Sequence, residues 1–471
     1  MYLSQGFRPF LRTTPEEQNT PSAAVQEFSN SLLRVAGHIR GFCLVQNGKV
    51  IAEEYRKPYE SGDRVWVYSV SKSFASTAVG IAIDEGLLAL DDSVLSFFPE
   101  SAPLTPPKNL RAMRVRDLLC MSTGHAEDTT LPILMSPDGD WIKMFLSLPV
   151  EYEPNTHFLY NTGASFMLSA ILQKAAGEKL LDYLAPRLFA PLGFDDVEWD
   201  ENPQGINTGG WGISLRLEDL AKLGQLYLDK GLYNGRRILS QQWVETATSF
   251  QSDNSKTDNQ APDWISGYGF QFWLCQHGAF RADGAGGQFC IVMPRQNAVL
   301  AIMSETMQMQ AILDAVWGEL LPRLGNMALP AENDISGRTY YMDDNELGIH
   351  QIHFSFGKEM IKLSFSGANS CCLEAGRGCW LASETAMPLG FRAIIPMFSQ
   401  ASQPKRISAW SCWLDPNTLE INWVYLDTPH RDKLICTFTG GRIEIFCPPS
   451  GAALFKKQGG MRLGGAVKVS T

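Results

Sequence analysis

The sequence predicts a mixed α/β fold of the α+β type: an antiparallel sheet flanked by helices, a helical subdomain, and a separate carboxyl-terminal β domain. Strand-like segments near residues 41–55 and 280–304 enclose a long, mostly helical stretch, about 87–266. Beyond residue 335, short alternating runs of polar and apolar residues recur with turn residues between them. A chain of 471 residues also fits more than one domain, because single cores stop growing at roughly 250–300 residues. We therefore expect a first domain over 1–328 and a β-rich accessory domain over 329–471.

The composition favours a globular protein that binds neither nucleic acid nor membrane. Hydrophobic residues make up 45% of the chain and charged residues 19%. The net charge is −10 and no Lys/Arg-rich run is present, which argues against nucleic-acid binding. Residues 1–20 lack a signal peptide's apolar stretch, and no apolar run approaches the ~18–20 residues that cross a bilayer. The sequence therefore predicts a cytoplasmic protein.

The first half of the chain opens with a hairpin and a buried helix. The runs GFCLVQ (41–46) and KVIAEEY (49–55) alternate as strands do and are joined at Asn47-Gly48, a typical hairpin turn. Small and apolar residues recur at helical spacing from Lys72 to Gly86. Glycine often ends a helix, so we expect this helix to stop at Gly86.

A second group of strands follows the helical stretch. Within that stretch we expect helices at about 166–177, 180–188, 217–230 and 240–247. Strand character returns at 280–281, 289–294 and 298–304, and a helix is expected at about 308–321. Strands from both ends of the helical stretch can then share one sheet.

The carboxyl-terminal third begins after a break in periodicity at 322–335, where Gly, Pro and Asn accumulate. Alternating runs then occur at 349–356, 359–366, 391–395, 407–414, 419–426, 434–439 and 442–447, which predicts a β domain. The sequence of this domain contains no motif from which we infer a catalytic or binding residue. Shaping the cleft, self-association into a homo-oligomer and binding of a partner are the open alternatives for its role.

The cysteine and histidine positions do not indicate a metal site. None of the ten cysteines forms the C-x2–4-C spacing typical of structural zinc. His350 and His353 stand at odd spacing in a strand-like run, which places their side chains on opposite faces. We expect no bound metal.

The strongest chemical signal is Ser69-x-x-Lys72 at the start of the predicted helix. Residues three apart on a helix share a face, so the Lys72 amine comes within reach of the Ser69 hydroxyl. Serine is a weak nucleophile until a neighbouring base takes its proton, and a buried lysine can do so because desolvation lowers its pKa. The helix amino terminus also favours developing negative charge. The alternative is an ordinary serine N-cap beside an exposed lysine.

Several stretches in the same order resemble the β-lactamase-related serine hydrolases, the family of class C β-lactamases, DD-peptidases, esterases and D-aminopeptidases. They are YSVSKSFAST (68–77), DEGLLALDDSVLSFFPE (84–100), MRVRDLLCMSTGH (113–125), FLYNTGASFMLSAILQKAAG (158–177), GGWGISLRLEDLAKLGQLYL (209–228) and GAGGQFCIVMP (284–294). The resemblance covers about 37–324. It implies a β-lactamase/transpeptidase-like fold and an acyl-enzyme formed on Ser69 with Lys72 as base.

The family's second motif, Tyr-x-Asn, matches Tyr160-Asn161-Thr162, so the tyrosine is present and the third position is threonine. The resemblance implies that Tyr160 moves protons between nucleophile and leaving group. Asn161 or Thr162 is expected to take the substrate contact of the family's asparagine. A buried structural tyrosine is the alternative.

The third motif, Lys-Thr-Gly or His-x-Gly, aligns with Asp283-Gly284-Ala285, followed by Gly286. Where relatives place a cation this chain places a carboxylate, which removes the group that attracts a substrate's own carboxylate and argues against β-lactam hydrolysis. We expect four residues here to contact the substrate: Asp283, Gly284, Ala285 and Gly286. The N–H near Gly286 then completes an oxyanion hole beside that of Ser69. Alternatively, Asp283 turns away or pairs with Arg281 or Arg64.

Together these motifs predict a serine hydrolase of the esterase, amidase or D-peptidase type, acting on a small ester, amide or peptide without a cofactor. The chain lacks the G-x-S-x-G and H-E-x-x-H patterns of other hydrolases. A second hypothesis is a weak or inactive penicillin-binding-like binder or sensor that retains the fold, since fold alone does not settle activity. His125 and Trp211 lie in motif loops, and we expect them to pack rather than to catalyse.

Overall fold

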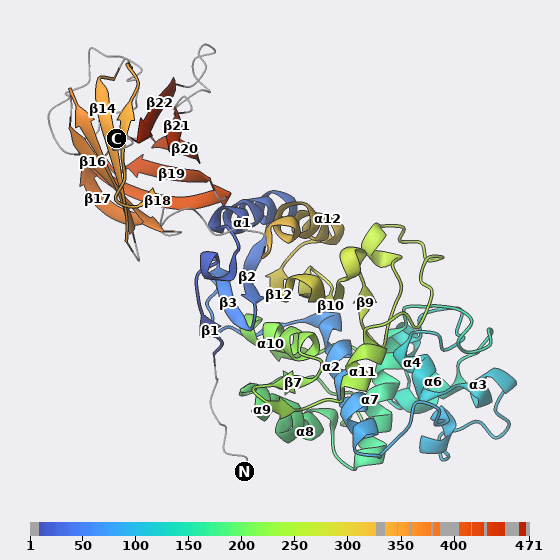
Figure 1. Cartoon of the computed structure of the whole chain (residues 1–471). Helices are drawn as coiled ribbons and strands as arrows, with labels where there is room; N and C mark the ends of the chain where they lie inside the picture. The colour runs from blue at the N-terminus through green and yellow to red at the C-terminus, as the bar shows by residue number, and fades with distance from the viewer. Residues whose placement is uncertain are drawn as a thin grey trace. The chain divides into compact units, whose positions relative to one another are not determined.

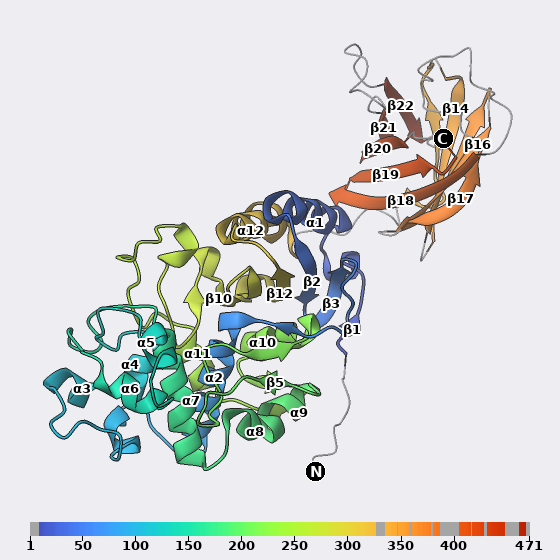
Figure 2. The same cartoon turned by 180° about the vertical axis from the view of Figure 1, so that it is seen from behind.

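The chain forms two compact units. The computed structural model describes residues 9–325, 335–345, 347–357, 360–368, 370–377, 380–386, 405–415, 417–427, 431–447 and 461–467. The first unit comprises Met1–Thr13 with Ser29–Leu321, and the second comprises Thr14–Phe28 with Pro322–Thr471. Figures 1 and 2 show the chain from two opposite sides. The expected boundary at 328/329 lies outside the described residues. Among the helices described, none combines the length and apolar character that a membrane crossing needs.

A seven-stranded sheet forms the centre of the first unit. Its pairs are antiparallel except for the parallel pair of β1 and β3. In spatial order the strands are β1 (Leu11–Arg12), β3 (Lys49–Tyr55), β2 (Ile39–Gln46), β12 (Ala298–Ser304), β11 (Gln288–Met293), β10 (Phe280–Gly284) and β9 (Trp273–Leu274). The antiparallel sheet expected from segments at both ends of the helical stretch is therefore confirmed.

Strands β2 and β3 form the hairpin that the sequence predicts. The β2–β3 turn has φ of 50° at Asn47 and 74° at Gly48, both in the left-handed region. Two positive φ values are what a two-residue turn needs to match the twist of its strands. The pairing joins Gln46 to Lys49 across this turn.

Helices cover the sheet on both sides. Figure 1 shows α12 (Met309–Ala315) on one side, and α10 (Leu217–Leu228) and α2 (Ser71–Asp84) on the other. Helix α10 packs tightly: a Cβ added at Gly224 would stand 2.4 Å from a Val299 methyl group, and Cys290 Sγ donates to the Leu220 carbonyl at 3.3 Å. Helix α10 thus packs directly on the central sheet, although it lies within the stretch expected to form the helical subdomain.

Further helices and short strands complete the first unit, and α7 (Thr162–Ala176) and α8 (Leu180–Leu184) pack against α2. Helix α1 (Ser22–Ala36) precedes β2. The shorter helices are α3 (Lys108–Ala112), α4 (Val115–Leu119), α5 (Thr130–Leu134), α6 (Trp141–Ser147), α8 (Leu180–Leu184), α9 (Ala190–Leu192) and α11 (Gln241–Ala247). The short helical turns include η2 (Tyr68–Val70), η5 (Pro262–Trp264) and η8 (Val316–Leu320). The short strands are β4 (Val65–Trp66), β5 (Glu198–Trp199), β6 (Ile213–Leu215), β7 (Leu232–Tyr233) and β8 (Arg236–Arg237).

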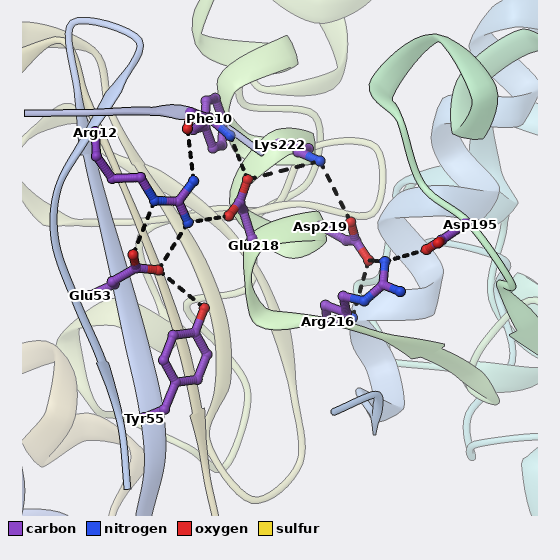
Figure 3. A network of polar contacts seen from close by, with 9 residues as sticks. All are labelled: Phe10, Arg12, Glu53, Tyr55, Asp195, Arg216, Glu218, Asp219 and Lys222. Carbon is purple, nitrogen blue, oxygen red and sulfur yellow. Dashed lines mark hydrogen bonds and ion pairs between the residues drawn. The ribbon is translucent and has the colours of Figure 1, made fainter. Parts of the chain in front are cut away.

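A network of charged side chains fastens β1 to α10 (Figure 3). The Arg12 guanidinium donates to Glu53 on β3 at 3.0 Å and to Glu218 on α10 at 2.6 Å. The backbone N–H of Phe10 donates to the other oxygen of Glu218 at 2.6 Å. Nζ of Lys222 lies 4.0 Å from Glu218, and both side chains are almost fully buried. Buried charges are costly unless they are paired, so these contacts fix the amino-terminal strand in place.

The described strands of the second unit form a closed β-barrel. In order they are β16 (Cys371–Arg377), β15 (Met360–Gly367), β14 (Ile349–Phe356), β13 (Thr339–Met342), β22 (Met461–Val467), β21 (Arg442–Cys447), β20 (Arg431–Thr439), β19 (Thr418–Tyr425), β18 (Lys405–Asp415) and β17 (Leu381–Thr385). A parallel pairing of β16 with β18 closes the ring. Alternate side chains such as Leu419, Ile421 and Trp423 fill its interior. The predicted separate β domain is confirmed, and the expected run 391–395 lies outside the described residues.

Candidate active site

The turn that carries Ser69 is held in a strained backbone conformation. Strand β4 leads into η2, from which α2 continues. Tyr68, directly before Ser69, has φ of 48°, a left-handed conformation that costs a non-glycine residue of order 1–3 kcal/mol. The Ser71 hydroxyl donates to the Tyr68 carbonyl at 2.6 Å and stabilises the turn. Ser69 is thereby left half-buried at the amino-terminal end of α2, while the side chain of Lys72 is buried one turn further on.

The amine of Lys72 lies directly beside the hydroxyl of Ser69. The distance from Nζ to Oγ is 2.9 Å, and Nζ also donates to the Gly210 carbonyl at 2.8 Å. Burial lowers the pKa of Lys72 to about 7, while the negative charges of Asp128 and Asp283 oppose this shift. A lysine in this state is a proton acceptor near neutral pH. The exposed-lysine alternative to the Ser-x-x-Lys motif therefore does not apply.

The Gly210 carbonyl is a site feature that the motifs did not predict. A Cβ added at Gly210 would lie 2.5 Å from the Thr162 methyl group, and one at Gly209 would lie 2.6 Å from the Ser165 carbonyl oxygen. Only glycines allow this loop to approach α7 so closely, and that approach brings the carbonyl to Lys72. The two adjacent glycines of GGWG (209–212) were the sequence feature that could have indicated this close approach. The sequence interpretation instead considered Trp211, which packs half-buried against Trp141 with ring centroids 5.8 Å apart.

Tyr160 completes a group of three with Ser69 and Lys72. The Ser69 side chain lies close enough to Tyr160 to lower the pKa of its phenol, and Nζ of Lys72 lies 5.0 Å from the centre of the Tyr160 ring. Burial and the negative charge of Asp283 raise the pKa of Tyr160 well above its usual value. The phenol therefore keeps its proton at neutral pH and is able to donate it. The structure brings together all three residues that the sequence proposed as catalytic.

Asn161 and Thr162 begin helix α7 and differ in their surroundings. The Asn161 side-chain oxygen accepts from the backbone N–H of Gly163 at 3.1 Å, and from the hydroxyl of Thr129 at 2.7 Å. Asn161 is fully buried, whereas Thr162 is partly exposed. The backbone N–H of Thr162 donates to the exposed carboxylate of Asp128 at 3.2 Å. The amide oxygen of Asn161 thus caps the helix, and Thr162 is the more accessible of the two.

The segment 283–286 runs alongside the Ser69 turn. A Cβ added at Gly284 would stand 2.2 Å from the Val67 carbonyl oxygen and 3.2 Å from the Ser69 nitrogen, so the two backbones are in direct contact. Ala285, Gly286 and Gly287 form the turn between β10 and β11. The hydroxyl of Ser304 donates to the carbonyls of Gly286 and Gly287, each at 2.9 Å. This turn is therefore fixed next to the site.

Asp283 pairs with Arg281, one of the two partners that the sequence left open. Nε of Arg281 donates to the Asp283 carboxylate at 2.8 Å, whereas Arg64 binds Asp195. The Asp283 side chain is 8% exposed and that of Arg281 is fully buried. Burial raises the pKa of Asp283, and the charge of Arg281 opposes this effect. The third motif of this chain thus presents a carboxylate already joined to a cation.

His125 is buried and packs against residues of its own loop and of α6. Its ring lies 4.9 Å from that of Phe145, and Nδ1 is 2.8 Å from the Thr123 hydroxyl. Burial lowers the pKa of His125 to about 4, so the imidazole is neutral at physiological pH. These contacts agree with the expectation of a packed loop histidine. Within the described residues no group of three or more His, Cys, Asp or Glu side chains is arranged to hold a metal ion.

Comparisons with known proteins place this fold and site in a family. The Beta-lactamase family model matches residues 7–318. The chain is 26% identical over 280 residues to a 6-aminohexanoate-dimer hydrolase from Paenarthrobacter ureafaciens, an alignment that covers 56% of this chain and 71% of the relative. It is 24% identical over 357 residues to penicillin-binding protein 4 from Amycolatopsis lactamdurans, covering 68% and 89%.

A solved structure supports the same assignment of fold. The hydrolase EstCE1, described with promiscuous acyltransferase activity, superposes with a TM-score of 0.52 at 19% identity, over 63% of this chain and 98% of EstCE1. At 19% identity, this similarity supports a shared fold and nothing about activity. The family model, by contrast, matches well over half of the chain and spans the Ser69 turn, Tyr160 and segment 283–286. The chain belongs to the Beta-lactamase family.

Proposed function

We propose that this protein is a serine hydrolase that cleaves small esters or amides through an acyl-enzyme on Ser69. The observation that carries the proposal is the 2.9 Å contact between Ser69 Oγ and a buried Lys72 amine whose pKa is lowered to about 7. In this state Lys72 can take the serine proton as the new bond forms. The hydrolase relative from Paenarthrobacter ureafaciens supports the reaction class.

The reaction has two halves. The Ser69 oxygen attacks the substrate carbonyl while its proton passes to Nζ of Lys72, giving a tetrahedral oxyanion. Collapse breaks the bond to the leaving group, which receives a proton through the Tyr160 hydroxyl, and the acyl group stays on Ser69. Water then attacks the ester, Tyr160 and Lys72 relay its proton, and the acid departs as Ser69 is reprotonated.

The proposed oxyanion hole consists of two backbone N–H groups. One belongs to Ser69, in η2 directly before α2, and the other to the turn near Gly286, whose position is fixed by Ser304. Donors held rigidly at such a site need no reorganisation when charge develops, which makes them effective. The direct backbone contact between Gly284 and the Ser69 turn keeps the two donors at a constant separation.

The charges near the site favour neutral or amine-bearing substrates over anionic ones. Asp128 and Asp283 both raise the pKa of Lys72, so both carboxylates lie near the reacting groups; Asp283 is already paired with Arg281, so the preference depends mainly on Asp128. Asp128 is exposed, and its interactions with Thr130 and Thr162 use one carboxylate oxygen, Oδ1. A substrate carboxylate would be repelled there, whereas an ammonium group would be attracted. The repulsion of a substrate carboxylate is a second reason to expect that the chain does not act on classical β-lactams.

Mass spectrometry after exposure to a fluorophosphonate or an activated ester tests the proposal. We expect a covalent adduct on Ser69, together with turnover of the ester. A stable adduct without turnover, or no adduct, would favour the second hypothesis, a binder or sensor that retains the fold. The missing cation of the third motif is the observation that keeps that hypothesis open.

A further inference from the structure

A cluster of side chains beside Tyr160 takes no part in the bond-making and proton-transfer steps written above. We call Trp273, Arg281 and Asp283 the Asp283 cluster. Arg281 and Trp273 stand opposite each other in the pairing of β10 with β9, and Asp283, two residues along β10, points to the same face as Arg281. The Asp283 carboxylate accepts a hydrogen bond from Nε of Arg281 at 2.8 Å, and the Trp273 side chain lies close enough to that carboxylate to lower its pKa.

The cluster touches Tyr160 through one residue, Trp273. The two rings are stacked, with centroids 5.3 Å apart and planes inclined by 27°. Tyr268 packs edge-on against both, at 6.2 Å from Tyr160 and 5.0 Å from Trp273. Each such aromatic pair contributes about 0.5–1.5 kcal/mol beyond burial, so the indole and Tyr268 together restrain the orientation of the phenol ring.

The other end of the cluster is anchored firmly. Arg281 is fully buried, and its Nη1 donates to the Asp263 carbonyl at 2.8 Å. The guanidinium lies 3.9 Å from the centre of the Trp264 ring and 5.3 Å from that of Trp273. Because an unpaired buried guanidinium is costly, Asp283 is held in place by the cation it neutralises.

We propose that Asp283 is a positioning residue, which acts through Trp273 to hold the Tyr160 hydroxyl in line with Ser69. The proposal rests on the serine-hydrolase function proposed above. It explains why a carboxylate stands where relatives carry a cation: the group points inward to an indole and a guanidinium, and only 8% of its side chain is exposed. Misplacing a reacting group by about 1 Å can lower the rate a hundredfold. Side chains that hold Trp273 against one face of the Tyr160 ring therefore affect the rate.

The first test is the variant Trp273→Phe, measured with a neutral ester. Phenylalanine retains a ring against Tyr160 but lacks the polar indole N–H through which Trp273 interacts with Asp283. We expect kcat to fall about tenfold with KM changed less than twofold, because the loss concerns a proton-transfer group rather than substrate binding. Trp423→Phe is the matched control, since Trp423 is a fully buried tryptophan of the second unit's barrel and does not belong to the cluster. Equal kcat values for the two variants would overturn the proposal.

The second test separates positioning from charge. Asp283→Asn should also lower kcat, and it should move the acid limb of the pH profile of kcat/KM to lower pH, because a negative charge near Lys72 is lost. Trp273→Phe keeps that charge, so its acid limb should stay at the wild-type pH. A wild-type protein without turnover or adduct would reject the proposed function itself. A working wild type with full kcat in Trp273→Phe would reject only the positioning role, even if Asp283→Asn failed to fold.

Discussion

The backbone carbonyl of Gly210 accepts a hydrogen bond of 2.8 Å from Nζ of Lys72, a residue 138 positions earlier in the chain. The same amine faces Ser69 Oγ at 2.9 Å. A neutral amine has two N–H donors and one lone pair. When one N–H is directed at Gly210, the lone pair can face Ser69 and receive its proton, so the carbonyl orients the base.

Ser69→Ala tests the nucleophile. We expect ester turnover to be abolished while the melting temperature stays nearly unchanged, because the substitution removes one half-buried hydroxyl. Turnover and thermal unfolding of the same preparations provide the comparison. Turnover equal to wild type in this variant would reject the assignment.

The pH profile of kcat/KM tests the base. Lys72 must be neutral to accept a proton, and burial lowers its pKa to about 7. Activity should therefore be full above about pH 7 and fall tenfold per unit as the pH drops below it. Initial rates with a substrate that does not ionise in this range give the profile. An activity that is constant down to about pH 5 would contradict a lysine base with this pKa.

Gly284→Ala tests the contact between β10 and the Ser69 turn. The added Cβ would stand 2.2 Å from the Val67 carbonyl oxygen, so the turn must move. A displacement near 1 Å predicts a loss of kcat of about a hundredfold. Gly62→Ala is the control, since a Cβ there meets no atom within 4 Å. Similar kcat values for both variants would show that the contact does not set the position of Ser69.

The charge of the substrate should matter. Because Asp128 and Asp283 lie near the reacting groups, we expect higher kcat/KM for substrates without a free carboxylate than for matched substrates that carry one. The difference should shrink as salt is added, since exposed charges such as Asp128 are screened. A clear preference for the carboxylate-bearing substrate would refute this expectation.

Glu218→Gln tests the network of Figure 3. Glu218 binds Arg12 and the Phe10 N–H, and the substitution removes one of the two carboxylates near buried Lys222, the other being Asp219 at 3.8 Å. Breaking a buried pair costs about 3–5 kcal/mol, so the free energy of unfolding of the first unit should fall by about that amount. Denaturant unfolding followed by loss of activity measures it. Glu245→Gln, in an exposed pair with Lys230, should cost at most about 1 kcal/mol, and an equal cost would contradict the role assigned to burial.

The sequence by itself determined the features that depend on neighbours along the chain. Ser69 and Lys72 lie one helical turn apart, so their contact follows from helix geometry once α2 forms. The Asn47-Gly48 turn follows from the conformations those two residues tolerate. The alternation of β14, β19 and β20 likewise follows from the two-residue period of a strand, and β13, β16, β17 and β22 were missed because their patterns are short or weakly alternating.

Only the tertiary structure decided the contacts between residues far apart in sequence. The two-residue period of β10 places Asp283 on the same face as Arg281, but only the packing decided that Arg64 binds Asp195, 131 positions away, rather than Asp283. The Gly210 carbonyl reaches Lys72 because a loop packs against α7, and β16 pairs with β18 because the barrel closes. The period of a helix or strand fixes the face on which each side chain lies. The packing of the whole unit decides which residue it contacts on that face.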